Sequence, residues 1–385
     1  MPSQSYWERE TFFKDLDVVI LGSGIVGLSA AIRLKEMEPR LNVTIVERGA
    51  LPLGASTRNA GFACFGSASE LLDDLETQPE AAVFELVERR FRGLENLKRL
   101  LGAGKIRYEH LGGYELFRTG EKARFEACAG ALSHFNAQLK GITGLSETYQ
   151  ILNPADTGFG FADVRGVIFN RGEGQLHTGR MVDTLLEKAR AAGVRVITGL
   201  LIQAFHAGPD RITLETADGW TFESRMMLLA ANGFAARLMP ELAVRPARNQ
   251  VLVTKPVPGL KFKGSFHYDR GYYYFRDIDG RVLLGGGRCL DIEGETTDQF
   301  GTTDRISNAL TGLLQEMILP GIPFEIDTWW SGIMGMGDEK KPIIRKLAPN
   351  LAAAVRFGGM GVAIGTLAGA EAAEMLMDAA TPRPG

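Results

Sequence analysis

The sequence is poor in several features that would assign a protein class at once. Its 385 residues include only three cysteines, which are widely spaced, so neither a disulfide framework nor a metal-ligand pattern is expected. The formal net charge is −3 without a long run of one sign, which argues against nucleic acid as a main partner. Low-complexity linkers and internal repeats are also lacking.

No apolar run reaches the length of a membrane span, and residues 1–15 lack the basic and apolar segments of a signal peptide. Sparse cysteines fit a reducing compartment, so we expect a cytoplasmic protein. The sequence does not indicate an oligomeric state. It is 45% hydrophobic, which is enough to form more than one core.

The sequence does contain a glycine-rich unit in residues 17–48. An apolar run at 18–21 precedes a glycine-rich turn, a helix-like segment follows, and a second apolar run ends at Glu47. This order is typical of a strand, turn, helix and strand that bind a dinucleotide, although a glycine-rich turn in another α/β domain is the alternative. The turn consists of Gly22, Ser23, Gly24, Ile25, Val26 and Gly27.

Each part of this unit has a role in dinucleotide binding. Gly22 permits a tight turn, Gly24 lets a pyrophosphate approach the backbone, and Gly27 lets the helix pack against the strand. The helix N-terminus offers unpaired N–H groups and a partial positive charge to the phosphates. Glu47 is placed to accept hydrogen bonds from an adenosine ribose, and Arg48 follows it.

A second glycine-rich turn lies in residues 357–365 and also precedes a helix-like segment. Its N–H groups and the positive helix end would stabilise the negative charge of a reduced flavin. Alternatively, these glycines serve only the close packing of helix against sheet. Together the two turns favour FAD as the dinucleotide. The predicted contacts here are Gly358, Gly359, Met360, Gly361 and Val362.

Apolar periodicity predicts the elements between these turns. Helices are expected at 80–101, 121–139 and 178–192, and a turn with a helix at 357–378. A hairpin is expected over 108–118, around Gly112 and Gly113. Further strands are expected at 194–197, 212–216, 221–229, 249–255, 271–276, 281–286 and 324–330.

Several of these motifs together resemble the D-amino-acid oxidase superfamily of FAD-dependent oxidoreductases, which includes glycine oxidase, sarcosine oxidase and gamma-glutamylputrescine oxidase. Residues 54–61 resemble the GASGRNGG element of the gamma-glutamylputrescine oxidase branch. Residues 229–233 resemble an AAGAW-type loop, with Asn232 in place of a glycine. The segments 273–276, 279–281 and 285–288 resemble strands of the substrate domain, and the similarity extends over residues 17–377.

The resemblance implies an α/β fold in which an FAD-binding, Rossmann-like domain of glutathione-reductase type is interleaved with a β-rich α+β substrate domain. The FAD-binding domain would comprise residues 15–80, 165–240 and 331–380, the substrate domain residues 81–164 and 241–330, and an N-terminal extension residues 1–14. For Ser56 and Asn59, helix capping is an alternative to cofactor contact. The implied further cofactor contacts are Ala55, Ser56, Thr57, Arg58, Asn59, Ala60, Gly61, Ala231, Asn232, Gly233 and Gly332.

The chain departs from the superfamily pattern in three places. Residues 329–336 contain no arginine of the kind with which amino-acid oxidases clamp a substrate carboxylate, so simple glycine or a D-amino acid is not favoured as substrate. The same stretch contains no flavin-linking cysteine, which implies non-covalent FAD. Residues 56–59 replace the histidine that sarcosine oxidases carry near the first flavin loop.

A cluster of aromatic residues is the best candidate for the lining of a substrate pocket. Alternate residues of a strand face opposite sides, so Tyr272 and Tyr274 share one face. We predict that both line the pocket together with Met334, although core packing is the alternative for each. Such a pocket would attract an amine or cation. Arg276 and Arg288 are alternative anchors for a substrate anion, unless they form surface ion pairs.

The predicted function is FAD-dependent oxidation of a primary or secondary amine, in which hydride passes from the α-carbon to flavin N5 and the resulting imine hydrolyses. Oxygen or another acceptor would reoxidise the flavin. No general base is assigned: His177 is expected to be structural and Cys64 an inert buried thiol. The alternatives are an FAD-dependent dehydrogenase of a 2-hydroxy acid or polyol phosphate, which needs a base such as histidine near the flavin, and a non-catalytic flavin-binding protein.

Overall fold

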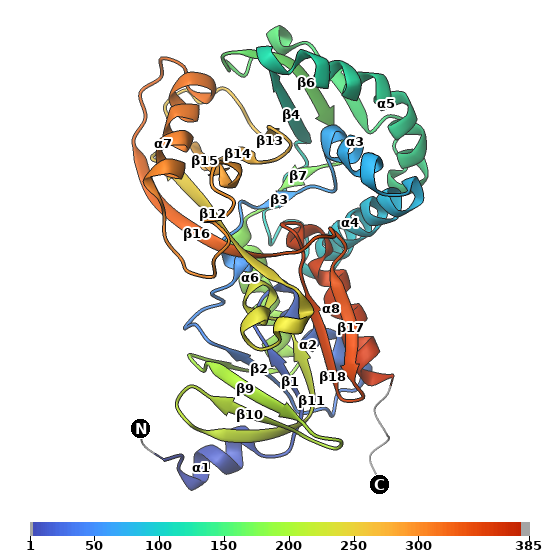
Figure 1. Cartoon of the computed structure of the whole chain (residues 1–385), viewed down its shortest axis with the longest axis vertical. Helices are drawn as coiled ribbons and strands as arrows, with labels where there is room; N and C mark the ends of the chain where they lie inside the picture. Colours follow the sequence, from blue (N-terminus) through green and yellow to red (C-terminus); the bar gives the residue numbers. More distant parts are fainter. Residues whose placement is uncertain (1–2, 379–385) are drawn as a thin grey trace.

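The computed structural model describes residues 3–378 and is built around two large sheets, one in each half of an elongated molecule (Figure 1). The segment between them contains a small pairing of β3 (Phe62–Ala63) with β7 (Gly174–Gln175). A short N-terminal helix, α1 (Tyr6–Glu8), lies at the lower end of the molecule. No helix within residues 3–378 is long and apolar enough to cross a membrane.

The first sheet is parallel at its centre. Its strand order is β17-β18-β11-β1-β2-β8, and β10 and β9 extend from β11. Strand β1 is parallel to both β2 and β11, and all of its residues are buried, which explains its nearly continuous apolar sequence. The strands are β1 (Leu16–Leu21), β2 (Val43–Glu47), β8 (Arg195–Thr198), β9 (Ile202–Ala207), β10 (Ile212–Thr216), β11 (Thr221–Leu229), β17 (Ile343–Ala348) and β18 (Leu351–Val355).

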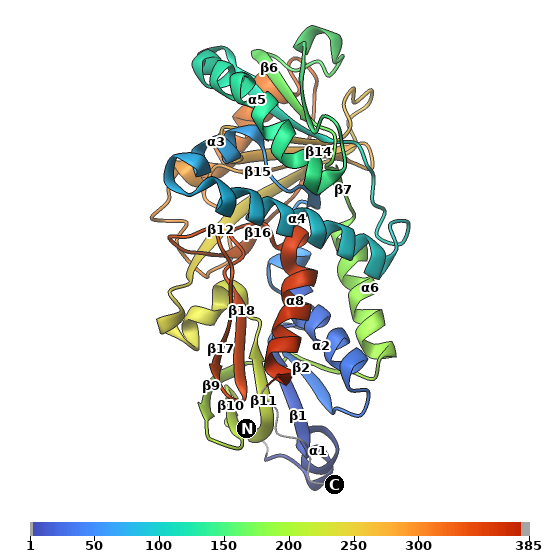
Figure 2. The ribbon, with the colours of Figure 1, turned by 90° about the vertical axis from the view of Figure 1, so that its right-hand side faces the viewer.

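Three helices, α2 (Ile25–Met37), α6 (Thr178–Ala191) and α8 (Gly361–Met377), lie along one face of the first sheet, and Figure 2 shows α2 and α8 side by side. A Cβ atom on Gly369 would lie only 2.5 Å from the carbonyl oxygen of Val26. The two helices therefore touch backbone to backbone, which only glycine permits at this point.

The second sheet has the strand order β16-β12-β15-β14-β13-β4-β6-β5. All neighbours are antiparallel except β13 and β4. The core beneath it is rich in phenylalanine, and the rings of Phe266 and Phe275 stack with their centroids 4.9 Å apart. The strands are β4 (Gly113–Arg118), β5 (Tyr149–Leu152), β6 (Val164–Asn170), β12 (Arg245–Thr254), β13 (Ser265–Tyr268), β14 (Tyr273–Ile278), β15 (Arg281–Gly286) and β16 (Ile326–Met336).

Four helices accompany the second sheet: α3 (Ala68–Thr77), α4 (Glu80–Leu101), α5 (Lys122–Thr143) and α7 (Asp304–Leu313). Helix α7 contributes apolar side chains to the phenylalanine-rich core. Helix α4 instead crosses the N-terminal part of α8, where a Cβ atom on Gly93 would lie 2.0 Å from the carbonyl oxygen of Ala363. Helix α4 therefore joins the two halves of the molecule.

The predicted helices at 80–101, 121–139 and 178–192 are confirmed as α4, α5 and α6. The predicted hairpin over 108–118 is wrong. Only β4 forms there, and it pairs with β6 and β13, which are distant in sequence. Residue Glu109 instead forms an isolated bridge with Gln175. Gly112 and Gly113 are needed because Phe169 and Glu173 occupy the space that their Cβ atoms would fill.

Two strands bear on the domain division. Strand β6 pairs with β4 and β5 in the second sheet, although its residues fall almost entirely within the segment 165–240. Strand β16 pairs with β12 on both sides of residue 331. We propose that the division into two interleaved domains holds, with its boundary after β6 rather than at 165. Residues 379 and 380 of the last predicted segment lie outside the described residues.

The close crossing of α4 and α8 generates a stability prediction. We expect Gly93→Ala to destabilise the protein by about 1–3 kcal/mol, because the added methyl group forces the two helices apart. Gly130→Ala in α5 is the matched control, since a Cβ atom there meets nothing within 4 Å and should stabilise the helix slightly. Urea unfolding of both variants measures the difference, and equal stabilities would contradict this account.

Candidate cofactor and substrate site

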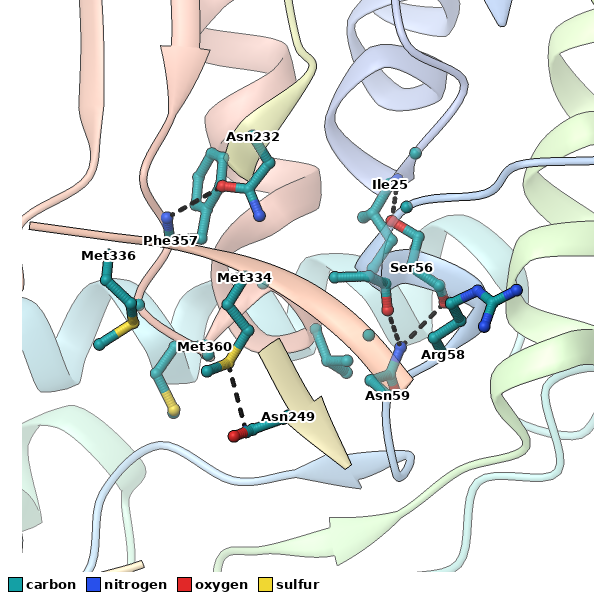
Figure 3. A pocket seen from close by; sticks show the side chains of 18 of the residues that line it. Ile25, Ser56, Arg58, Asn59, Asn232, Asn249, Met334, Met336, Phe357 and Met360 are labelled. Atoms are coloured by element: carbon teal, nitrogen blue, oxygen red, sulfur yellow. Dashed lines mark hydrogen bonds between the residues drawn. The ribbon is translucent and has the colours of Figure 1, made fainter. Parts of the chain in front are cut away.

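A large cavity of about 650 Å³ lies between the two sheets and is lined by residues from both. Its walls include the turns before α2 and α8, the loop after β2, and parts of β12, β13, β14 and β16. Figure 3 shows Met334, Met360 and Asn249 on one side of this space and Ser56 and Asn59 on another. Cavities of this size are typical of cofactor and substrate sites.

The N-terminus of α2 faces this cavity. Gly22 has a φ of 110°, which favours glycine, and it turns the chain sharply from β1 toward the helix. The N–H of Ile25 donates to Oγ of Ser56 at 2.9 Å. The N–H groups of Gly24 and Val26 have no acceptor within residues 3–378, and both residues line the cavity. The unpaired N–H groups and the helix dipole suit a pyrophosphate.

Glu47 ends β2 at the cavity wall and is 5% exposed. Its Oε2 accepts hydrogen bonds from the N–H of Ser23 at 3.1 Å and from its hydroxyl at 2.8 Å. Its Oε1 accepts the N–H of Gly49 at 2.9 Å. Oε1 also accepts a long hydrogen bond from the N–H of Leu53 at 3.5 Å, so the carboxylate is held in one orientation at the cavity wall. Nearby, the guanidinium of Arg48 lies 3.6 Å from the centre of the Phe234 ring.

The N-terminus of α8 faces the same cavity. Gly358 and Gly359 have φ values of 56° and 87°, and the N–H groups of Gly361 and Val362 have no acceptor in the described part of the chain. Asn232 takes the left-handed conformation, with φ 46°, that its position in the loop requires. The two helix ends provide separate sets of N–H donors at one cavity, as FAD requires for its pyrophosphate and its flavin ring.

The loop at 55–61 is fixed by hydrogen bonds within the protein. Asn59 Nδ2 donates to the carbonyls of Ala55 and Ser56, and its Oδ1 accepts the N–H of Gly61 at 2.8 Å. Arg58 donates to the carbonyl of Ser331 at 2.9 Å, and Trp330 Nε1 donates to the carbonyl of Arg58 at 3.0 Å. These bonds bind the loop to β16 and so join the two sheets at the cavity.

The structure brings most of the predicted cofactor contacts to this cavity and places the others outside its lining. Ser23 and Thr57 use their hydroxyls within the protein, on Glu47 and on the carbonyl of Pro52. Three predicted glycines lie behind the cavity wall, where they allow neighbouring backbone segments to pack closely: Gly27, Gly61 and Gly233. The predicted residues that line the cavity are Gly22, Gly24, Ile25, Val26, Glu47, Arg48, Ala55, Ser56, Arg58, Asn59, Ala60, Ala231, Asn232, Gly332, Gly358, Gly359, Met360, Gly361 and Val362.

The predicted pocket residues Tyr272, Tyr274 and Met334 also line the cavity. Tyr273 points the other way and stacks on Tyr268, as strand alternation requires. Asn249 Nδ2 lies 3.6 Å from the sulfur of Met334, and Asn249 also hydrogen-bonds the hydroxyl of Tyr274. Figure 3 shows Asn249 directed at the Met334 thioether.

The structure distinguishes between Arg276 and Arg288, the two arginines considered as anchors for a substrate anion. Arg276 is 2% exposed and donates to the carbonyls of Ala60, Gly61 and Leu176, so it clamps the backbone and cannot anchor a substrate. Arg288 lines the cavity and forms no ion pair with any residue in 3–378. It is therefore available to an anion.

A charged group on the cavity wall was not predicted from the sequence. Lys340 bridges Glu70 and Asp74 of α3 at 3.0 and 2.7 Å, and Arg90 lies 3.1 Å from Glu70. Burial acts to raise the pKa of Glu70, but Arg90 and Lys340 outweigh it and lower the pKa to about 2. Lys340 is far in sequence from its acidic partners Glu70 and Asp74, so no pattern of residue spacing could have predicted this group.

His267 is the second residue that was missed. It lies on the cavity wall, and its ring meets that of Phe62 edge to face at 5.2 Å. Burial lowers the pKa of His267 to about 4, so the ring is neutral at neutral pH. Cys64 lines the same cavity, and burial raises its thiol pKa, which keeps it protonated and unreactive. His177 caps α6 through Nδ1, as its structural interpretation predicts.

Comparison with known proteins agrees with this architecture. The family model described as DAO, FAD dependent oxidoreductase, matches residues 17–375. A probable oxidoreductase, OrdL, of Rhizobium meliloti is 27% identical over 95% of this chain and 84% of its own length. A glycine oxidase from Bacillus cereus superposes with a TM-score of 0.75 at 16% identity, covering 95% of this chain and 96% of its own. An iminodiacetate oxidase from Chelativorans sp. gives 0.73 at 20% identity, covering 95% and 97%.

The fold and the cavity therefore define an FAD-dependent oxidoreductase. The chain belongs to the DAO family of FAD-dependent oxidoreductases, and FAD is its cofactor. The predicted fold class is confirmed, since a sheet with parallel strands for the dinucleotide is joined to a large β-rich sheet.

The position of Glu47 gives a prediction for cofactor affinity. We expect Glu47→Gln to raise the Kd for FAD at least about tenfold, because hydrogen bonds to a charged acceptor contribute about 1.5–3 kcal/mol. Fluorescence quenching during titration of the apoprotein measures the constant. Glu126→Gln, an exposed change on α5, should leave the Kd unchanged. An unaltered Kd in Glu47→Gln would remove this residue from the cofactor site.

Proposed function

We propose that the protein oxidises a primary or secondary amine to an imine, which then hydrolyses. FAD, bound non-covalently, would supply the acceptor for the hydride that leaves the α-carbon of the amine. The residues of the chain bind and orient the substrate and exclude water, and distance and alignment dominate the rate of such a transfer.

The observation that carries this proposal is the composition of the cavity wall beside the α8 turn. Tyr272, Tyr274 and Met334 form an aromatic and thioether surface, and a Cβ atom on Gly359 would lie 3.5 Å from the Met334 sulfur. Aromatic faces attract amines and cations. The names glycine oxidase and iminodiacetate oxidase, carried by proteins of the same fold, agree with an amine as substrate.

Arg288 suggests that the amine also carries an anionic group. It is a cavity-lining cation without an ion pair in residues 3–378. A guanidinium recognises a carboxylate with two parallel hydrogen bonds. We therefore propose an amine with a carboxylate, bound in a different manner from the arginine clamp that residues 329–336 lack.

A second candidate function is supported by His267. A 2-hydroxy-acid or polyol-phosphate dehydrogenase needs a base near the flavin, and this histidine lies on the cavity wall in its neutral form. A flavin-binding protein without turnover is a third candidate, which no particular residue favours.

The deciding experiment is an anaerobic titration of the holoenzyme, followed in the visible spectrum. We expect secondary or primary amines that carry a carboxylate to bleach the flavin, and amines without one to require higher concentrations. Bleaching by hydroxy acids alone would transfer the assignment to the second candidate. Failure of every donor would leave a flavin-binding protein without turnover.

Two adjacent tyrosines provide a matched pair. We expect Tyr274→Phe to slow flavin reduction about fivefold, because it removes a hydrogen bond to Asn249 worth about 1 kcal/mol at the cavity wall. Tyr273→Phe changes the same atoms on the opposite face of β14 and should leave the rate unchanged. Stopped-flow reduction by one amine measures both, and equal effects would show that the pocket lies elsewhere.

A further inference from the structure

Two buried carboxyl groups lie behind the cavity wall and have no part in the cofactor or substrate contacts above. Glu115 is 5% exposed and Glu173 is 2% exposed, and neither forms an ion pair with any residue in 3–378. A buried carboxylate without a cation is costly, so such groups tend to be protonated or to serve a function.

The register of the second sheet connects these carboxyl groups to the cavity. Glu115 of β4 is paired with His267 of β13, and His267 is paired with Tyr274 of β14. Paired residues on neighbouring strands lie about 4.8 Å apart and point to the same face. Tyr274 and His267 line the main cavity, so Glu115 is the third side chain in a row that begins there.

A second, small cavity of about 10 Å³ lies behind His267. It has room for about one water molecule, and polar and titratable residues are among those that line it. His267 and Ser67 line both cavities and form the partition between them. The polar residues around the small cavity are Ser67, Glu115, Tyr149, Asn170, Glu173 and His267.

Glu173 has one oxygen free to exchange a proton. Its Oε1 accepts the N–H groups of Phe65 at 2.9 Å and Gly66 at 3.2 Å. Its Oε2 has no hydrogen-bond partner in the described chain and points toward Gly113, where a Cβ atom would lie 2.0 Å from it. Gly113 and Glu173 both line the small cavity, and this oxygen lies beside Gly113.

The imidazole ring of His267 has the properties needed to pass a proton on rather than to hold it. Neither ring nitrogen forms a hydrogen bond with residues 3–378, so a neutral imidazole keeps one donor and one acceptor free. Because burial lowers the pKa of His267 to about 4, a proton that reaches the ring does not remain on it.

We propose that Glu173 accepts the proton that the ammonium group of the substrate must lose before oxidation, and that His267 carries this proton between the two cavities. The proposal rests on amine oxidation as the function. The N–H bond of the ammonium breaks, the imidazole takes the proton at one nitrogen and releases one from the other, and an O–H bond forms on Glu173. The electron pair stays on the amine, which the loss of hydride requires, and no electrons are transferred in this step.

The environment of Glu173 sets the pH at which it acts. Burial, opposed by the N–H groups of Phe65 and Gly66, raises the pKa of Glu173 to about 8. The carboxylate is the accepting form, so flavin reduction should become faster as pH rises through about 8. The titratable and charged groups that surround Glu173 are Cys64, Glu70, Arg90, Tyr108, Glu115, Tyr149 and His267.

The test measures anaerobic flavin reduction by an amine across pH. We expect Glu173→Gln to slow reduction about 10²-fold just above pH 8, where the wild-type carboxylate is formed, and to recover the wild-type rate above the pKa of the amine itself, where the substrate is already neutral. His267→Phe keeps the contact with Phe62 and should show the same loss and recovery. Glu295→Gln changes a buried carboxyl that lines neither cavity and should leave the profile unchanged.

Infrared difference spectra between low and high pH provide a readout that needs no substrate. We expect a protonated-carboxyl band that disappears through about pH 8 in the wild type and in His267→Phe, and that is missing in Glu173→Gln. If amines bleach the flavin but Glu173→Gln keeps the wild-type profile, or if the infrared band is unchanged in Glu173→Gln, the inference is wrong while the proposed function stands. If no amine bleaches the wild type, the proposed function fails and the inference fails with it.

Discussion

The backbone contact between α2 and α8 is the constraint on which the site depends. Gly369 lets α8 approach the carbonyl of Val26, and Gly365 lets it approach Ile25. Two helices that are this close, and that begin at the same cavity, present two sets of free N–H groups at a fixed separation. One dinucleotide can then satisfy both ends, because phosphates and a reduced flavin each favour a positive helix terminus.

The second sheet completes the site without disturbing this arrangement. The side chain of Arg58 donates to the carbonyl of Ser331, and the carbonyl of Arg58 accepts from Trp330, so the 55–61 loop is fixed to β16 from the substrate side of the cavity. Arg276 reaches back from β14 to three carbonyls of the first half of the molecule. Both arginines therefore hold the two halves of the molecule together, whereas Arg288 lines the cavity without an ion pair to any residue in 3–378.

Local signals predicted the glycine-rich turns at the cavity because such turns are short, contiguous motifs. Gly22, Gly24 and Glu47 could be grouped from spacing alone and do line one cavity, and strand alternation correctly separated the ring faces of Tyr272 to Tyr274. The hairpin at 108–118 failed because β4 finds its partners in β6 and β13, distant strands that no local pattern reveals. His267 and Lys340 were missed for the same reason: each reaches the cavity through tertiary contacts, without a neighbouring sequence motif.

The crossing of α4 over α8 has a consequence for how substrate enters. Gly93 lies against the backbone of Ala363, and the hydroxyl of Thr366 donates to the Gly93 carbonyl at 3.2 Å. This seam holds the upper half of the molecule rigidly to the start of α8, beside the cavity. A hinge motion that separates the two halves would have to break this contact between α4 and α8. We therefore expect substrate and product to pass through small movements of side chains and loops rather than through a motion of the two halves.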